Sequence, residues 1–264
     1  MAIYITVRQP PRYHQMTLEE LLFSNTDYSS EIGQTPGGTI TYKRDVVSET
    51  LKRGMSYWSL RSELVSFNDR HSALMDAPRM ELYEEFYIPK RSGGLRKIDA
   101  PNPELMKALN ELKDIFEFKF KAMHHTAAFA YIQNRSTVDA VRKHQMNESR
   151  WFGMLDLHNF FGSITLEYTL KMLSYIFPFS MFFEHHDQKI LERALELGFL
   201  DGGLPQGSPL SPMLTNLIMI PIDFKLSNEL LDFESQHFIY TRYADDFQIS
   251  SRYNFDIKKD SKAG

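Results

Sequence analysis

The sequence of 264 residues contains no cysteine, which excludes disulfide bonds and thiolate metal sites. A chain without cysteine is compatible with the reducing cytoplasm, and we expect a cytoplasmic protein. No apolar run reaches about 18 residues, so we expect neither a membrane-spanning helix nor a membrane partner. Residues 1–8 lack the long apolar stretch of a secretory signal.

The sequence also lacks an excess of positive charge, because its formal net charge is −4. Nucleic-acid-binding proteins are often basic overall, but the field along a groove decides binding more directly than the sum does. Lysine and arginine concentrate at residues 90–97, 107–121 and 135–143. A nucleic-acid partner therefore remains compatible with the composition.

The hydrophobic content of 42% is enough for one domain or two closely joined subdomains.

Two adjacent acids, Asp245 and Asp246, lie between the short β-patterned runs 238–240 and 247–250. This pattern predicts a hairpin with both carboxylates at its tip. Like charges side by side cost stability, and a shared Mg²⁺ ion removes that cost. An isolated Asp-Asp pair is more often a solvated surface turn, because aspartate favours turn geometry. The rest of the chain has to decide between the two interpretations.

A third acid, Asp156, lies near the end of the apolar run Trp151–Leu157, which predicts a buried strand. If this strand and the hairpin are neighbours in one sheet, the three carboxylates converge and could hold two divalent ions for an in-line displacement. Phe161 follows five residues later, where an aromatic ring could press against a bound sugar. The alternative for Phe160 and Phe161 is an ordinary place in the core.

The segment Ser92–Gly94 predicts the turn of another hairpin. Its flanks bring Lys90, Arg91, Arg96 and Lys97 together, as a clamp for triphosphate charge requires. A solvated basic hairpin is the alternative.

Five segments now match one family in order. They are residues 87–101, 129–136, Asp156 with Phe161, 203–212 and 243–246. Together they resemble bacterial reverse transcriptases of the retron, group II intron and defence-associated types. The resemblance implies an α+β fold with the palm and fingers of a right-hand polymerase, in which helices back an antiparallel palm sheet. It divides the chain into a mainly helical N-terminal extension (1–82), fingers (83–150) and palm (151–264), and no C-terminal thumb is evident.

The resemblance also implies a metal site. Asp156 and Asp245 would ligate two Mg²⁺ ions with help from the Leu157 carbonyl, and Asp246 would complete the acidic triad. Mn²⁺ is an alternative ion.

The implied nucleotide pocket contains six residues, of which Leu157 also belongs to the metal site. Lys90 and Arg96 would hold the incoming triphosphate, and Gln206 and Gly207 would line the pocket. Phe161 would be the steric gate that rejects a ribose 2′-hydroxyl. Arg135 would contact the template.

The implied function is RNA-directed DNA polymerase, which adds deoxynucleotides to a primer 3′-hydroxyl. Its partners would be an RNA template, a DNA or RNA primer and deoxynucleoside triphosphates, with a dedicated structured non-coding RNA as a further candidate. Two alternatives stay open. One is a template-independent or protein-primed DNA polymerase of an antiviral defence system, and the other is a non-catalytic RNA-binding module of palm and fingers.

Hydrophobic spacing and capping residues predict several helices along the chain. They are expected at 46–68, from Pro103 to about His124, from Ser136 or Thr137 to His144, from Thr165 towards Tyr175, at 185–197 and from Met213 onward. Thr17–Leu22 resembles the start of a further short helix.

Replacing Phe161 with alanine or valine is expected to admit ribonucleotides, because a smaller side chain leaves room for the 2′-hydroxyl. Incorporation of each nucleotide type, measured separately, gives the discrimination ratio. Unaltered sugar discrimination would remove Phe161 from the gate role.

Overall fold

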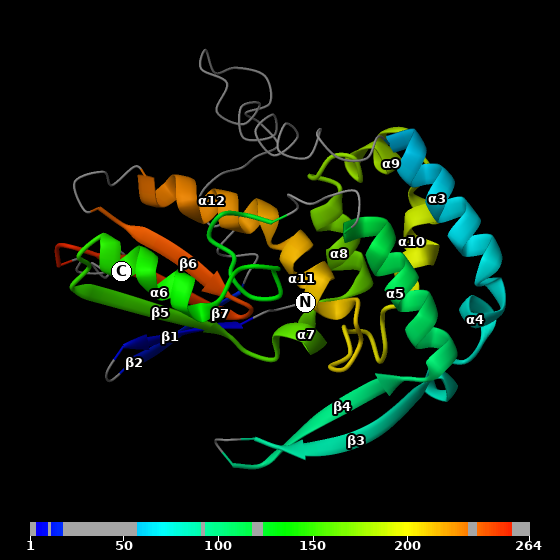
Figure 1. Ribbon diagram of the computed structural model, residues 1–264, viewed down its shortest axis with the longest axis horizontal. Helices are drawn as coiled ribbons and strands as arrows, with labels where there is room; N and C mark the ends of the chain where they lie inside the picture. Colours follow the sequence, from blue (N-terminus) through cyan, green and yellow to red (C-terminus); the bar gives the residue numbers. More distant parts are fainter. Residues whose placement is uncertain are drawn as a thin grey trace, which may run out of the picture.

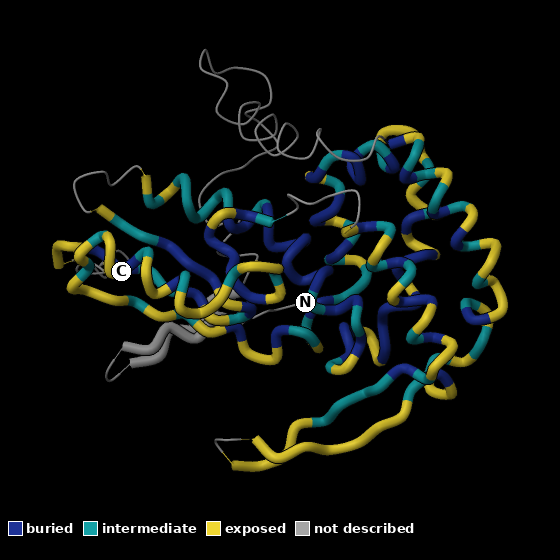
Figure 2. The backbone as a smooth tube through the Cα atoms, viewed as in Figure 1, coloured by how far each residue is buried: buried dark blue, intermediate teal, exposed yellow. Residues whose placement is uncertain are grey.

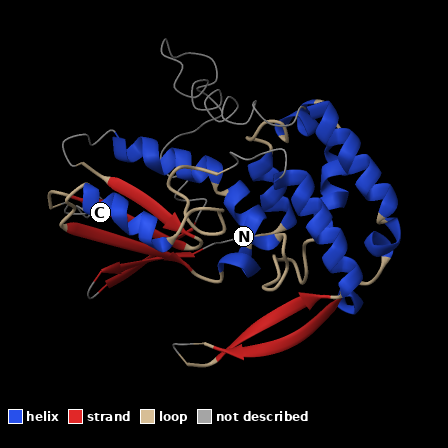
Figure 3. Ribbon diagram, viewed as in Figure 1, coloured by secondary structure: helices blue, strands red, loops and turns tan. Residues whose placement is uncertain are grey.

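The computed structural model describes residues 4–9, 12–17, 57–90, 93–117, 124–231 and 237–254, with only the backbone described in the first two ranges. The fold is α+β. An antiparallel sheet lies at one end, a helical body lies at the other, and a two-stranded hairpin projects beside them (Figure 1; Figure 3).

The main sheet has five strands in the order β2-β1-β5-β7-β6, and every neighbouring pair is antiparallel. The strands are β1 (Tyr4–Gln9), β2 (Arg12–Thr17), β5 (Trp151–Leu157), β6 (Ile239–Tyr243) and β7 (Asp246–Ser251). The predicted hairpin is confirmed as β6 and β7. Strand β5 lies between β1 and β7, so the segment that carries Asp156 is the direct neighbour of the segment that carries Asp246.

Strand β5 differs from the expected buried strand. Phe152 and Met154 are exposed, and they lie on the same face of β5 as Asp156 because side chains alternate along a strand. Leu155 points the other way and packs with Phe247 against the core. The prediction of a fully buried strand was therefore wrong, since one face of β5 is open.

The separate hairpin pairs β3 (Tyr83–Pro89) with β4 (Leu95–Pro101). Gly93 and Gly94 both have positive φ, and the Lys90 amide donates to the Gly94 carbonyl at 3.0 Å. This turn confirms the predicted one, because only glycine adopts such angles without steric cost. The outer part of the hairpin is exposed, as Figure 2 shows by its yellow trace.

Helices form the body and cover the main sheet. They are α3 (Tyr57–Arg70), α4 (Ser72–Asp76), α5 (Pro103–Glu117), α6 (Thr137–Met146), α7 (Phe160–Ser163), α8 (Leu166–Leu173), α9 (Ser180–Glu184), α10 (Gln188–Glu196), α11 (Ser211–Ile218) and α12 (Ile220–Leu231), with a 3₁₀ turn at Arg79–Leu82. Within the described part of the chain, none of these helices is long and apolar enough to cross a membrane.

Helix α5 illustrates how the sequence specifies this body. Its predicted apolar stripe is fully buried, with Leu105, Leu109, Leu112 and Phe116 in the core. The Asn102 side chain accepts a hydrogen bond from the Leu105 amide at 2.8 Å, which caps the first turn.

Several predicted boundaries shift. The helix expected at 185–197 begins at Gln188, because His186 has a φ of +60° and interrupts the helix after α9. The helix expected to reach about His124 ends at Glu117 in its described part, and His124 is not helical. The helix expected from Met213 onward divides at Met219 into α11 and α12.

The described N-terminal part contains strands as well as helices. Its first described residues form β1 and β2, which extend the main sheet through β5. Thr17 is the last residue of β2 rather than the start of a helix. Residues 18–22 of that predicted helix lie outside the described residues. Residues 46–56 of the helix predicted at 46–68 also lie outside them, and helix α3 is its described part.

Replacing Leu109 with alanine is expected to lower the free energy of unfolding by about 2–5 kcal/mol, because the side chain is fully buried in α5. Lys107→Ala, on the exposed face of the same helix, is the matched control and is expected to change stability by less than about 0.5 kcal/mol. Chemical denaturation measures both, and equal effects would contradict the assigned core.

Candidate active site

The pairing of β5 with β7 brings the three predicted acids together. Asp156 and Asp246 are direct register partners, and the Leu157 amide donates to the Asp245 carbonyl at 3.2 Å. Opposite residues of an antiparallel pair have Cβ atoms about 4.5–5.5 Å apart. Residues separated by some ninety positions in the chain thus lie next to one another.

The turn that carries Asp245 is short and strained. Tyr243 pairs with Asp246, so only Ala244 and Asp245 connect β6 to β7. Ala244 is buried and has a φ of +58°, in a region that non-glycine residues seldom adopt. Two-residue hairpins require such angles because their twist then matches that of the strands. The surroundings must therefore hold the turn in place.

The carboxylates at this turn repel one another. Burial raises the pKa of the Asp245 carboxyl, and the charges of Asp246 and Asp156 raise it further, while the Arg96 guanidinium acts in the opposite direction. A divalent cation would relieve this repulsion, so the residues fit a magnesium site. Across the described residues, no three His, Asp or Glu side chains are grouped as a complete ligand set. Mg²⁺ commonly combines one or two carboxylates with substrate phosphates, which is the arrangement that this site allows.

A cavity of about 900 Å³ opens beside the turn. That volume is typical of a ligand pocket. Leu157, one of the six residues predicted for the nucleotide pocket, is buried in the core and does not line the cavity, whereas Asp245 lies in the wall together with the other five. These are Lys90, Arg96, Phe161, Gln206 and Gly207. The structure thus gathers residues from the hairpin, from α7 and from the loop before α11 around one space.

Phe161 reaches the cavity because α7 follows β5 directly. Phe160 is buried in the core, which is one of the alternatives that the sequence left open, whereas Phe161 is only partly buried and its contact with a sugar stays a prediction. The Leu204 amide donates to the Phe161 carbonyl at 3.0 Å. A side chain at Gly203 would collide with the Gly162 carbonyl, so this glycine allows the loop to approach α7 closely.

Gln206 and Gly207 join the cavity to the hairpin. The Asp99 amide of β4 donates to the Gln206 carbonyl at 2.8 Å. Gly207 has a φ of +126°, and a Cβ atom there would lie 2.7 Å from the Asp99 carbonyl oxygen. Only glycine meets both conditions, so this loop packs directly on the base of the hairpin.

The cationic residues of the hairpin differ in their surroundings. Lys97 pairs with Glu85 at 2.9 Å and with Asp99 at 3.1 Å, and these carboxylates raise its pKa. Lys90 and Arg96 are exposed beside the cavity. Arg91 lies outside the described residues. Lys97 also lines the cavity, so its pairing with two carboxylates is what distinguishes it from Lys90 and Arg96, and the sequence alone could not show this.

Comparison with known proteins decides the family. Residues 88–262, more than half of the chain, match the family model described as reverse transcriptase (RNA-dependent DNA polymerase). The chain belongs to the reverse transcriptase family.

Relatives within this family include retron enzymes. The chain is 29% identical over 188 residues to the retron Ec73 reverse transcriptase of Escherichia coli, covering 68% of this chain and 56% of that protein. It is 31% identical over 175 residues to the retron Ec83 reverse transcriptase of the same species, covering 64% and 53%. The match thus spans about half the length of these relatives. An apo telomerase from Candida tropicalis, truncated from its C-terminal domain, aligns with a TM-score of 0.43 and 14% identity over 68% of this chain and 45% of the other.

Arg135, predicted to contact the template, makes internal contacts in this reverse transcriptase fold. Its Nη1 atom donates to the His125 carbonyl at 3.0 Å and to the Ala128 carbonyl at 2.7 Å, and its guanidinium lies over the Phe129 ring. These contacts shape the segment that leads to Tyr131. The template role remains a prediction.

Tyr131 is a cavity residue that sequence reasoning did not single out. Its ring meets the Phe161 ring edge-on with centroids 6.4 Å apart. Burial raises the pKa of its phenol, and the Asp245 charge raises it further. The only local signal was its place in the segment 129–136, because its φ of +59° and its contact with Phe161 arise from the tertiary fold.

The raised pKa of Asp245 predicts a pH-dependent stability. A carboxyl whose folded pKa is raised stabilises the fold below its unfolded pKa of about 3.9, and this contribution is lost as pH rises through the folded pKa. Asp245→Asn is therefore expected to raise the melting temperature at pH 7–8 without metal, with the difference shrinking towards zero below pH ~4. Thermal melts across this range test it, and a lower melting temperature at pH 7–8 would contradict it.

Proposed function

We propose that this chain supplies the fingers and palm of an RNA-directed DNA polymerase. The observation that carries the proposal is one cavity lined by Asp245, by cations of the hairpin and by an aromatic ring, with the paired Asp156 and Asp246 next to Asp245. Membership of the reverse transcriptase family supports it. The hairpin β3–β4 belongs to the proposed fingers (83–150), and the sheet strands β5, β6 and β7 belong to the proposed palm (151–264).

The proposed reaction is nucleotidyl transfer. The primer 3′-oxygen forms a bond to the α-phosphorus of a deoxynucleoside triphosphate, the bond from that phosphorus to the bridging oxygen breaks, and pyrophosphate leaves. Asp156 and Asp245 with the Leu157 carbonyl would hold the divalent metal, and Asp246 would complete the acidic set. When bound, magnesium lowers the pKa of the attacking hydroxyl and neutralises charge on the leaving group.

The other groups position the substrate. Lys90 and Arg96 extend from the hairpin to the cavity and would bind the triphosphate. Phe161 and Tyr131 form an aromatic corner at the same cavity, where the sugar would rest. The loop at Gln206 and Gly207 would close the pocket against β4.

The partners follow from the proposed reaction and from the names of the relatives. An RNA template, a primer and deoxynucleotides are required. Because the similar proteins include retron reverse transcriptases, a structured non-coding RNA is the template that we would test first. The open face of β5, with Phe152 and Met154 beside Asp156, offers apolar surface next to the acids.

Asp245→Asn is expected to abolish Mg²⁺-dependent deoxynucleotide incorporation, by about 10³-fold or more, while the fold survives. The reason is that the substitution removes a ligand charge but keeps the shape of the side chain. Primer extension on a defined RNA template measures the loss.

The matched control is Asp76→Asn, which removes an exposed carboxylate paired with Arg193. This control should retain wild-type incorporation.

Full activity of Asp245→Asn would reject the assignment of the metal site. Equal product with and without template would favour a template-independent polymerase. RNA binding without any Mg²⁺-dependent nucleotide binding would favour a non-catalytic module.

A further inference from the structure

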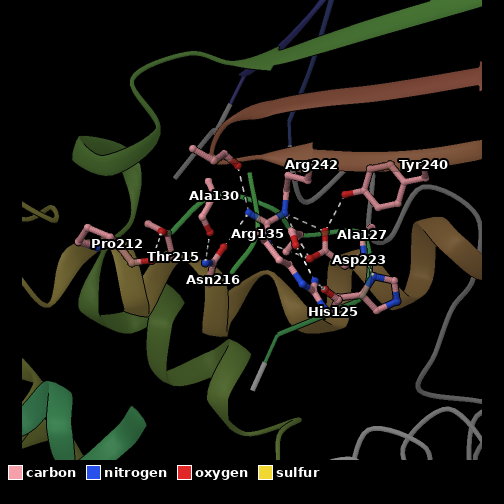
Figure 4. A network of polar contacts seen from close by, with 12 residues as sticks. His125, Ala127, Ala130, Arg135, Pro212, Thr215, Asn216, Asp223, Tyr240 and Arg242 are labelled. Atoms are coloured by element: carbon pink, nitrogen blue, oxygen red, sulfur yellow. Dashed lines mark hydrogen bonds and ion pairs between the residues drawn. The ribbon is translucent and has the colours of Figure 1, made fainter. Parts of the chain in front are cut away.

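A buried ion pair lies directly behind the acidic turn. Arg242 of β6 and Asp223 of α12 both have zero side-chain exposure. The Arg242 Nε donates to one Asp223 oxygen at 2.9 Å, and Nη2 donates to the other at 2.9 Å, so the contact is bidentate. The Tyr240 hydroxyl donates to the same carboxylate at 2.6 Å. Figure 4 shows these side chains converging on Asp223.

The remaining arm of the guanidinium reaches the turn. Nη1 of Arg242 donates to the Ala244 carbonyl at 3.1 Å and to the Asn216 side-chain oxygen at 3.2 Å. Ala244 is the residue with positive φ, and Asp245 follows it directly. The buried side chain therefore holds the carbonyl group that begins the peptide unit leading to Asp245.

The same network is tied to the cavity wall. Asn216 donates to the Ala130 carbonyl at 2.8 Å, next to Tyr131 (Figure 4). The Arg242 backbone is also paired on both sides, with its amide donating to Ala127 at 2.7 Å and its carbonyl accepting from Phe129 at 2.9 Å. Helix α11, which carries Asn216, begins where Ser211 donates to the Pro205 carbonyl of the cavity loop at 2.9 Å. Thus one network spans the turn, α11, α12 and the segment that carries Tyr131.

We propose that Arg242 is a positioning residue whose guanidinium, clamped by Asp223, sets the place of the Ala244–Asp245 turn and aims the Asp245 carboxylate at the cavity. An ion pair alone does not require this geometry, because Arg242 uses three nitrogens on three different groups. A lysine could keep the charge next to Asp223, but its single nitrogen cannot serve Asp223, Asn216 and Ala244 together. The catalytic part of this inference rests on the proposed function, whereas the structural part does not.

The first test is Arg242→Lys, with hydrogen exchange measured by mass spectrometry on peptides that cover residues 239–250. We expect amides at the turn to exchange about tenfold faster or more, while peptides from α5 stay protected. In primer extension, kcat should fall about 100-fold and the Mg²⁺ concentration for half-maximal rate should rise, because a misplaced carboxylate affects chemistry and metal binding. The nucleotide KM at saturating Mg²⁺ should change less than about threefold, because Lys90 and Arg96 are untouched.

The chain provides a matched control. Arg61 of α3 binds Asp187 at 2.6 Å, and the Tyr57 hydroxyl donates to that same carboxylate, so a second Tyr–Asp–Arg cluster exists in the helical body. Arg61→Lys makes the same chemical change away from the turn. It should leave exchange at residues 239–250 and the Mg²⁺ dependence at wild-type values.

A second variant tests the proposal in case Arg242→Lys does not fold. Replacing the network by Arg242→Met, Asp223→Leu and Tyr240→Phe removes all its charges together, a change that buried ion pairs often tolerate. This variant is expected to fold, yet to show the same fast exchange at the turn. Wild-type protection and Mg²⁺ dependence in either folded variant would overturn the proposal. Failure of both to fold, while Arg61→Lys folds, would also overturn it and make the network a stability element.

The two hypotheses separate cleanly. If the wild-type protein incorporates no nucleotide but Arg242→Lys still releases the turn, the proposed function fails and the positioning role stands. If the wild-type protein is active and Arg242→Lys leaves kcat, Mg²⁺ dependence and exchange unchanged, only the positioning role fails.

Discussion

The antiparallel pairing of β5 with β7 is the constraint on which the site depends. Asp156 and Asp246 face each other because these strands pair in one register, and hydrogen bonds from Leu157 to Asp245 and from Arg150 to Ser251 close the pairing at both ends. A slip by one residue would turn Asp156 to the opposite face of the sheet. The two-residue connection between β6 and β7 fixes the register of that second pair, so backbone pairing sets the positions of all three acids.

Helix α11 gives this arrangement a rigid frame. Nearly all its residues are buried, and its start and middle contact different parts of the site. Its first turn holds the loop that carries Gln206 and Gly207, and Asn216 further along holds Arg242 and the segment before Tyr131. Precise sites need support from packed elements rather than from free loops. The cavity wall and the acidic turn therefore share one support.

The site also carries a cost in stability. Ala244 adopts a strained backbone angle, and burial of Asp245 beside two other acids raises the pKa of its carboxyl. Strain and repulsion of this kind collect at functional sites and persist only where the surroundings hold them. The fully buried pair of Arg242 and Asp223 is such a holding element, because neither group can leave the other without exposing an uncompensated charge to the interior.

Local patterns in the sequence determined the hairpins, the stripe of α5 and the ordered motifs that place Asp156, Phe161, Gln206 and Asp245 in one family, because turn chemistry and periodicity act over a few residues. The strands β1 and β2 and the open face of β5 depend on distant neighbours and were missed, and the break at His186 was missed as well. Tertiary structure alone decided that Lys97 pairs internally, that Tyr131 meets Phe161 and that Arg242 reaches the turn. Tyr131 and Phe161 are distant in the chain, the Arg242 side chain is buried, and Lys97 meets Glu85 only through the pairing of β3 with β4, so the chemical type of these side chains does not reveal their partners.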